Sequence, residues 1–229
     1  MSRQLSFDLP ARTALGRDAF MVGPSNSVAL AMIEGWRDWP QGKLVLLGPT
    51  GAGKTHLAHI WAEMTGARIV AGGLADLDIA VLAVSPVVIE DAEAVAGDPE
   101  AETALFHLHN LMAAEAQPLL LTAAKPPAQW GLTLPDLASR MQAAAVAQLA
   151  APDDAALAAV LAKLFADRQI APAPDLIPYL VTRMDRSFAT AQRLVDLLDR
   201  AALDAGRPVN RGLAKDVLAL DEQAQLDLD

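Results

Sequence analysis

The sequence has no cysteine, few aromatic residues and fewer basic than acidic side chains. The absence of cysteine excludes disulfides and thiolate metal sites, and it fits a reducing cytoplasm. Aromatic residues make up 4% of the 229 residues, and 28 Asp and Glu outnumber 18 Lys and Arg, for a formal net charge of −10. Because DNA binding relies on clustered Lys and Arg, this balance argues against direct, specific binding of DNA, although it does not exclude a local basic patch.

Long hydrophobic runs are also missing. Residues 1–15 carry scattered charges and have no apolar core of the kind found in signal peptides. The most apolar long stretch, residues 79–89, is too short to span a bilayer and contains Pro86. These features predict a cytoplasmic protein with no membrane partner.

Hydrophobic residues make up 53% of the chain, enough for a real core, and they fall into two patterns. In the first part, short apolar runs alternate with amphipathic stretches, which predicts a parallel sheet with helices on both faces. The helix over 28–36 follows Ser25 and Asn26, which are favoured capping residues. The predicted strands are 43–47, 67–70, 87–89 and 119–122, and the predicted helices are 28–36, 55–65 and 100–116.

No strand is predicted from Pro152 onward. The predicted helices there are 153–168, 175–184, 187–205 and 211–220. The change in composition near Ala150 predicts a domain boundary. We therefore expect a flexible N-terminal extension over 1–18, a nucleotide-binding domain over 19–149 and a helical domain over 150–229.

The loop after the first predicted strand fits the spacing G-x-x-x-x-G-K-[ST] in full. Glycines let backbone N–H groups turn toward phosphate oxygens, and the following helix points its positive end at the same anion. Lys54 supplies charge to the terminal phosphates of ATP or ADP, and the Thr55 hydroxyl can bind Mg²⁺. The predicted nucleotide-binding run is Gly48, Pro49, Thr50, Gly51, Ala52, Gly53, Lys54, Thr55 and His56.

Polar side chains end the next two buried strands. Glu90 and Asp91 follow strand 87–89, where one carboxylate can hold Mg²⁺ and the other can orient an attacking water. Both are therefore candidate catalytic and metal-binding residues. Thr122 ends strand 119–122 at the same sheet edge, where a hydroxyl can sense the γ-phosphate; a simple strand-end threonine fits equally well.

Arginines and histidines give weaker signals. Arg140 and Arg193 lie in or beside predicted helices, and an arginine that reaches a terminal phosphate promotes phosphoryl transfer. From spacing alone, each is an ordinary surface arginine. The four histidines form no metal-binding set, and we interpret their imidazoles as structural; His107 and His109 are two apart and point to different faces of a helix.

Several of these segments resemble the bacterial replication initiator DnaA and its AAA+ family. The run from Gly48 to Leu57 resembles the P-loop of that family. Residues 20–26 resemble the segment that lies against the adenine. Residues 120–122 with the following Pro126-Pro127 resemble the sensor segment, and 137–140 resemble the segment carrying the arginine finger. The resemblance covers residues 19–220.

The resemblance implies an α/β AAA+ domain, with a P-loop parallel sheet, followed by a small all-helical lid. It implies that Val22 contacts the adenine and that Thr122 is the sensor. It further implies that Arg140 is the arginine finger and Arg193 the sensor-two arginine, with Arg186 as the second choice for that role.

Two positions depart from the family pattern. The family usually has Asp where this chain has Glu90, and another Asp near Ala124. The longer Glu90 side chain can still reach Mg²⁺, whereas the missing Asp predicts feeble intrinsic hydrolysis.

The N-terminus holds a further motif, which resembles the hexapeptide that docks proteins on the replication sliding clamp, the β subunit of DNA polymerase. Its apolar side chains sit on a polar tail and can become ordered in a partner's groove; the alternative is a tail packed on its own domain. The predicted clamp-binding residues are Gln4, Leu5, Ser6, Phe7, Asp8 and Leu9.

Taken together, the segments resemble the regulatory inactivators of DnaA. DnaA continues into a helix-turn-helix DNA-binding domain, and this sequence ends where that domain would begin. The expected function is to dock on the clamp and to stimulate hydrolysis of ATP bound to DnaA, with a homodimer as a possible assembly. The first alternative is a helicase loader or DNA-binding paralogue of the initiator, which predicts DNA binding. The second is a small-molecule kinase, which needs an Arg-rich lid of a kind that we do not find.

Overall fold

The computed structural model describes residues 16–17 and 20–226, and the side chains as far as Asp221. Its sheet has five parallel strands in the order β2-β3-β4-β1-β5. The carboxyl ends of parallel strands meet at one edge, which is where open α/β sheets bind ligands. The strands are β1 (Lys43–Leu47), β2 (Arg68–Ala71), β3 (Val87–Glu90), β4 (Leu119–Ala123) and β5 (Ala145–Gln148).

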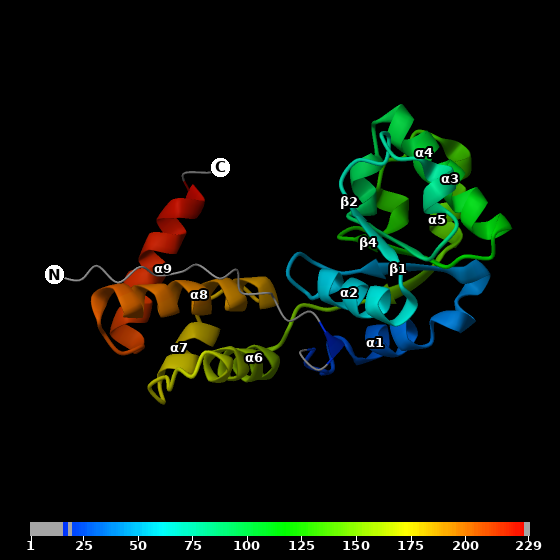
Figure 1. The fold of residues 1–229 in the computed structure, drawn as a ribbon. Coiled ribbons are helices and arrows are strands. Elements are labelled where there is room, and N and C mark those ends of the chain that lie inside the picture. The colour runs from blue at the N-terminus through cyan, green and yellow to red at the C-terminus, as the bar shows by residue number, and fades with distance from the viewer. Residues whose placement is uncertain (1–15, 18–19, 227–229) are drawn as a thin grey trace, which may run out of the picture.

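Helices cover both faces of this sheet (Figure 1). Alternate residues of β1 point to opposite faces, so Leu44 and Leu46 belong to one buried cluster and Val45 and Leu47 to the other. The first face is covered by α1 (Ser27–Glu34) and α2 (Lys54–Thr65), and the second by α3 (Ile79–Leu82), α4 (Pro99–Ala114) and α5 (Pro135–Ala143). Short 3-10 helices are η2 (Trp36–Asp38), η3 (Pro40–Gly42), η4 (Ala92–Val95) and η5 (Pro127–Gln129).

The second half of the described chain is helical, as predicted. Its helices build a separate apolar cluster around Leu161, Phe165 and Leu194, and it lies beside the sheet (Figure 1). We propose a boundary at Ala150, whose N–H donates to the Ser25 carbonyl oxygen at 3.0 Å. The helices are α6 (Asp154–Asp167), α7 (Leu176–Val181), α8 (Phe188–Ala205) and α9 (Arg211–Leu226).

The predicted parallel sheet and its first four strands are confirmed, whereas one strand, two α-helices and the short 3-10 helices were not predicted. The edge strand β5 reads Ala-Val-Ala-Gln and is only partly buried, so it lacks the apolar run that identified the other strands. Helices α3 and α5 were also not predicted. The helix predicted over 100–116 ends at Ala114, because Ala116 has a left-handed φ of 51° that a helix does not accept.

The capped helix predicted after Ser25 needs a correction. Asn26 does occupy the position before α1, but its side chain makes no capping hydrogen bond. Its Oδ1 accepts the Gly23 N–H and its Nδ2 donates to the Met21 carbonyl, both at 2.9 Å. The buried amide therefore fixes the shape of the segment before the helix. Among the described residues, no helix is long and apolar enough to cross a membrane.

Candidate nucleotide-binding site

The P-loop joins β1 to α2 at the carboxyl edge of the sheet. Gly51 has a φ of +74° and Gly53 a φ of +103°, which glycine adopts without the strain that a Cβ would cause. A Cβ on Gly51 would also lie 1.8 Å from Ser187 Oγ. The motif glycines are therefore required both by the backbone conformation and by contact with the helical half.

Lys54 is the first residue of α2 and is buried. Its ammonium donates to the carbonyl oxygens of Gly48 at 2.8 Å and Pro49 at 3.3 Å, so the charge lies within the loop. Thr55 follows it and is exposed. A cation inside a glycine-rich loop at a helix N-terminus is suited to binding a phosphate chain.

Aromatic side chains surround the same turn. From the position of a Cβ on Gly53, the Phe20 ring is 3.6 Å away and the Phe188 ring 3.8 Å away. Phe20 also meets the His56 ring edge-on, with ring centres 5.0 Å apart. Val22, the residue predicted to contact adenine, is 52% exposed and lies two residues beyond Phe20 in the sequence. Phe20 and Phe188 thus lie at the candidate site and are not among the residues predicted from the sequence, although Phe20 belongs to the segment 20–26 that resembles the adenine-contacting segment.

The helical half contacts the P-loop directly through the start of α8. The Phe188 N–H donates to the Gly51 carbonyl oxygen at 2.9 Å, and Ser187 caps α8 through the Thr190 N–H at 3.1 Å. One end of α8 points toward α2 in Figure 1. The start of α8 is therefore joined to the P-loop by a backbone hydrogen bond.

The two predicted carboxylates lie in a strained turn after β3. Asp91 is exposed and has a left-handed φ of 49°, a costly conformation that functional sites often retain. Its N–H donates to the Oγ1 of buried Thr122 at 3.0 Å, so the hydroxyl oxygen ties this turn to β4. The Thr122 hydrogen remains able to donate. Glu90 Oε1 is buried without a hydrogen-bond partner within the described residues.

Glu93 is a third acidic residue of this turn, and the sequence reasoning missed it. Its Oε1 accepts the Ala124 N–H at 2.5 Å, while its Oε2 is buried without a partner in the described part of the chain. The family that this chain resembles has an Asp near the position of Ala124. In this chain the Ala124 N–H instead bonds to Glu93, which follows the neighbouring strand β3. The described residues contain no cluster of three or more His, Cys, Asp or Glu able to hold a metal by themselves.

The two sensor-two candidates are both ion-paired. Arg193 bonds to Asp221 of α9 at 3.0 Å, and Arg186 bonds to Asp154 of α6 at 2.8 Å. Arg186 directly precedes Ser187, which contacts the P-loop, whereas Arg193 lies further along α8. Arg186, the second choice for this role, is therefore closer in the sequence than Arg193 to the residue that contacts the P-loop.

Arg140 lies far from the P-loop of its own chain. It is exposed in the last turn of α5, which ends at Ala143, and β5 begins shortly after at Ala145. Because β5 runs parallel to β1, its first residue belongs to the amino edge of the sheet. The positive charge of Arg140 also contributes to lowering the pKa of Lys43, so Arg140 lies near this first residue of β1. The P-loop, in contrast, follows the last residue of that strand. The two ends of β1 are about 13 Å apart.

The Arg140 guanidinium has a defined position. Its central carbon lies 5.3 Å from the centre of the Phe106 ring of α4, within the range of a cation–π contact. The start of α5 is fixed by buried Glu102, whose carboxylate accepts the N–H groups of Thr133 at 2.9 Å and Leu134 at 2.8 Å. Burial raises the pKa of Glu102. The hydrogen bonds that its carboxylate accepts from Thr133, Leu134 and Gly97 have the opposite and larger combined effect, so the pKa lies below its ordinary value.

Buried basic groups lie beneath Arg140. Burial, followed by the charges of Lys43 and Arg140, lowers the pKa of His109 to about 4, so this buried imidazole is neutral at pH 7. Burial and then the charge of Arg140 lower the pKa of Lys43, whose ammonium donates to the Gln41 carbonyl oxygen at 3.0 Å. The prediction that His109 is structural agrees with its burial.

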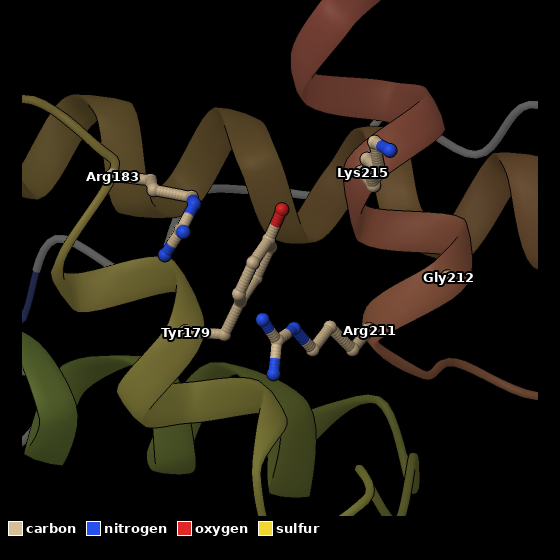
Figure 2. A pocket seen from close by; sticks show the side chains of 5 residues that line it. All are labelled: Tyr179, Arg183, Arg211, Gly212 and Lys215. Atoms are coloured by element: carbon tan, nitrogen blue, oxygen red, sulfur yellow. The ribbon is translucent and has the colours of Figure 1, made fainter.

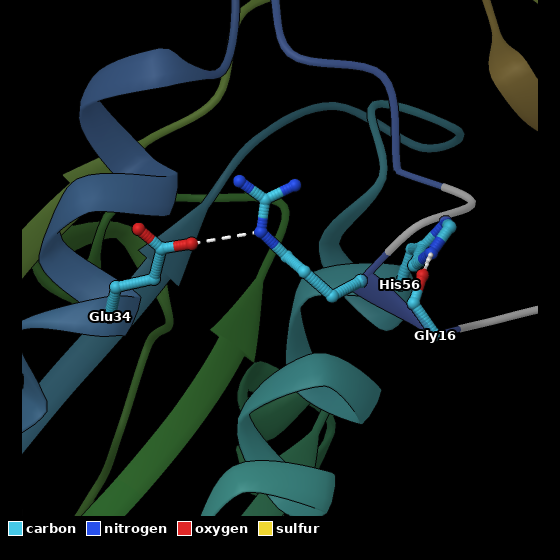
Figure 3. A network of polar contacts seen from close by, with 4 residues as sticks. Gly16, Glu34 and His56 are labelled. Atoms are coloured by element: carbon cyan, nitrogen blue, oxygen red, sulfur yellow. Dashed lines mark hydrogen bonds and ion pairs between the residues drawn. The ribbon is translucent and has the colours of Figure 1, made fainter.

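The base of the N-terminal extension lies on the first turn of α2 (Figure 3). His56 Nε2 is 3.2 Å from the Gly16 carbonyl oxygen, and Arg17 pairs with Glu34 of α1 at 2.8 Å. Burial lowers the pKa of His56, more than the bond to Gly16 raises it. His56 therefore serves as an anchor for this segment. The predicted clamp-binding residues 4–9 lie outside the described residues.

The parallel sheet, its P-loop and its flanking helices define an AAA+ fold. No protein-family model matches the sequence. Domain III of the replication initiation protein DnaA from Thermotoga maritima superposes with a TM-score of 0.79 at 18% identity, covering 92% of this chain and 98% of that one. AMPPCP-bound DnaA from Aquifex aeolicus gives 0.65 at 17% identity, covering 79% of this chain and 63% of that one. The Holliday junction branch migration motor RuvB from Thermotoga maritima gives 0.61 at 18% identity, covering 78% and 61%.

Proposed function

We propose that this chain is a DnaA-related AAA+ regulator of the Hda type. It binds an adenine nucleotide, docks on the sliding clamp and presents Arg140 to ATP bound on DnaA. An arginine supplied in trans stabilises the charge of the transition state and raises hydrolysis by orders of magnitude. The result would be inactivation of the initiator and a limit on replication initiation.

The position of Arg140 is the observation that carries this proposal. It is exposed, lies at the amino edge of the sheet and is held over the Phe106 ring. Because its own P-loop is at the opposite edge, an arginine finger at Arg140 would act on a nucleotide bound to another molecule. This favours a finger acting in trans over one serving the nucleotide of the same chain.

The nucleotide bound by this chain would have a conformational role. Its phosphates would lie against Lys54 and the loop glycines, and its base near Phe20 and Phe188. Glu90 Oε1 is buried and has no hydrogen-bond partner among the described residues, which fits a nearby cation, so Thr55, Glu90 and Asp91 would hold Mg²⁺ together with the phosphates. Mg²⁺ would supply charge neutralisation there. Since Phe188 bonds to Gly51, occupancy of the loop would set the position of α8.

Docking on the clamp is assigned to residues 4–9. The short segment that joins them to the sheet is anchored at Gly16 and Arg17 beside the P-loop. The clamp would thereby bring this chain near DnaA on the same DNA. A DNA-binding paralogue or helicase loader is the alternative function.

The test is ATP hydrolysis by DnaA in the presence of this chain, DNA-loaded clamp and ATP, with each component omitted in turn. Arg140→Ala should abolish the stimulation. Arg37→Ala is a matched control, because Arg37 is also exposed and lies 4.4 Å over an aromatic ring, that of Trp36. Stimulation by folded Arg140→Ala equal to that by the control would overturn the proposal.

A further inference from the structure

An open hollow of about 550 Å³ lies between α7 and the start of α9, far along the chain from the P-loop. The Tyr179 ring lies between the guanidinium groups of Arg183 and Arg211 (Figure 2). Their central carbons are 4.1 Å and 4.6 Å from the ring centre. Lys215, one helical turn beyond Arg211, adds a third cation to the lining. The hollow is therefore a concentrated basic surface on an acidic protein.

These cations are not neutralised within the described chain. No carboxylate of the described residues lies within ion-pairing distance of Arg183, Arg211 or Lys215. Asp216, which follows Lys215 in the sequence, pairs with Arg207 at 3.5 Å. All three lining cations are exposed.

The arrangement is unfavourable for the isolated fold. Arg211 begins α9, and a cation at the positive end of a helix is destabilising. Arg211 and Lys215 are like charges four residues apart on one helix, which adds repulsion. A bound anion would offset both effects, because it would be attracted to the two cations and to the positive end of the helix. Groups that cost stability locally and share one hollow indicate a binding role.

We propose that this hollow binds the phosphate backbone of nucleic acid without reading its sequence. Stacking on Tyr179 restricts both guanidinium groups, and Arg183 also donates to Thr182 Oγ1 at 3.0 Å. Their planar forks are thus held ready to grip phosphate oxygens in pairs. Both ring faces of Tyr179 are directed at guanidinium groups, so it does not offer a platform for a base. Contacts of this kind position nucleic acid and do not specify its bases.

The open shape favours a polymer over a small ligand. Small-molecule sites enclose most of their ligand, whereas this hollow opens to solvent between two helices. Several cations spread along a surface gain affinity from a chain of phosphates through release of its counterions. The inference does not depend on the proposed function, since neither the clamp nor DnaA takes part in its test.

The experiment is fluorescence anisotropy of a short labelled duplex and of its single strand with the full chain, over a range of salt concentrations and with saturating ADP. The test variant is Arg183→Gln with Arg211→Gln and Lys215→Gln. The control is Arg37→Gln with Arg68→Gln and Arg200→Gln, which removes the same charge from exposed sites elsewhere. The test variant should bind about tenfold or more weakly, and its log affinity should depend less steeply on log salt, by about 2 to 3 in slope.

Competition identifies the ligand. Unlabelled DNA of unrelated sequence should displace the probe equally well, and circular dichroism should show that both variants are folded. Equal binding by test and control variants, or no binding by the wild-type chain, would overturn the proposal. So would displacement at lower concentration by tripolyphosphate, which would indicate a small-anion site, or by poly-glutamate, which would indicate an acidic protein partner. The duplex and single-strand probes show which form is preferred.

Discussion

Arg140 lies over the face of Phe106, with its guanidinium carbon 5.3 Å from the ring centre. The two residues come from α5 and α4, so the contact joins the helices that cover one face of the sheet. A cation–π contact favours a planar guanidinium lying on the ring. The arginine is therefore oriented while remaining exposed, which is the state that a residue acting on another molecule requires.

Arg140→Lys should lose most of the stimulation of DnaA hydrolysis. Lysine keeps the charge but lacks the planar fork that can bind two phosphate oxygens and stack on Phe106. The measurement is the rate of clamp-dependent ATP hydrolysis by DnaA at matched amounts of folded variant. Nucleotide affinity and thermal stability of the variant should match wild type, because the side chain is exposed. A parallel loss of stability and of every activity would instead indicate a structural arginine.

Lys54→Ala should weaken ADP binding about 10- to 100-fold, the effect of removing one charged hydrogen-bonding group, worth about 1.5 to 3 kcal/mol. Isothermal calorimetry measures this affinity directly. Arg200→Ala is the control, since Arg200 is exposed on α8. Unchanged affinity in folded Lys54→Ala would remove the P-loop from the proposed nucleotide site.

Replacing Gln4, Leu5 and Phe7 by Ala should abolish clamp binding and leave ADP affinity unchanged. The reason is that a short apolar motif supplies its own contacts to a partner groove. Surface plasmon resonance on immobilised clamp gives the first quantity and calorimetry the second. Arg12→Ala with Leu15→Ala, outside the hexapeptide, should bind the clamp normally. Full clamp affinity in the triple variant would contradict the docking assignment.

The sequence was a good guide to the sheet and the P-loop, because both have strong local patterns. Residues 44–47 form a continuous apolar run after Lys43, and β1 occupies 43–47 with all five residues buried. The P-loop needs glycines at fixed positions, as the left-handed φ values of Gly51 and Gly53 explain. Local steric requirements of this kind are visible in a single sequence.

Contacts between distant segments could not be predicted in the same way. Strand β5 has a weak pattern because it is an edge strand, and its pairing with β1 is decided by tertiary structure. Phe188 reaches the P-loop from the helical half of the chain, and nothing in its local sequence indicates this. The cations around Tyr179 come from the turn after α7 and from the start of α9, and they gather only in the folded chain.

His109 should make the folded state less stable in mild acid. Its pKa is lowered from 6.5 to about 4 in the fold, so between these values the unfolded chain binds more protons than the folded one. The free energy of unfolding should therefore fall as pH decreases through this window, by roughly 2 kcal/mol from His109 between about pH 7.5 and about pH 5. Urea unfolding followed by circular dichroism at each pH measures it.

His109→Gln should reduce this dependence on pH, because glutamine does not titrate in the window. The absolute stability of the variant at neutral pH can change through packing, so the quantity to compare is the difference between the two pH values. His107→Gln is the matched control: it removes an exposed imidazole two residues away on α4 and should leave the difference near that of wild type. His56, whose pKa is also lowered, should contribute in the same direction and account for part of the dependence that His109→Gln retains. An unchanged difference in His109→Gln would show that its imidazole is not held neutral beneath Arg140 and Lys43.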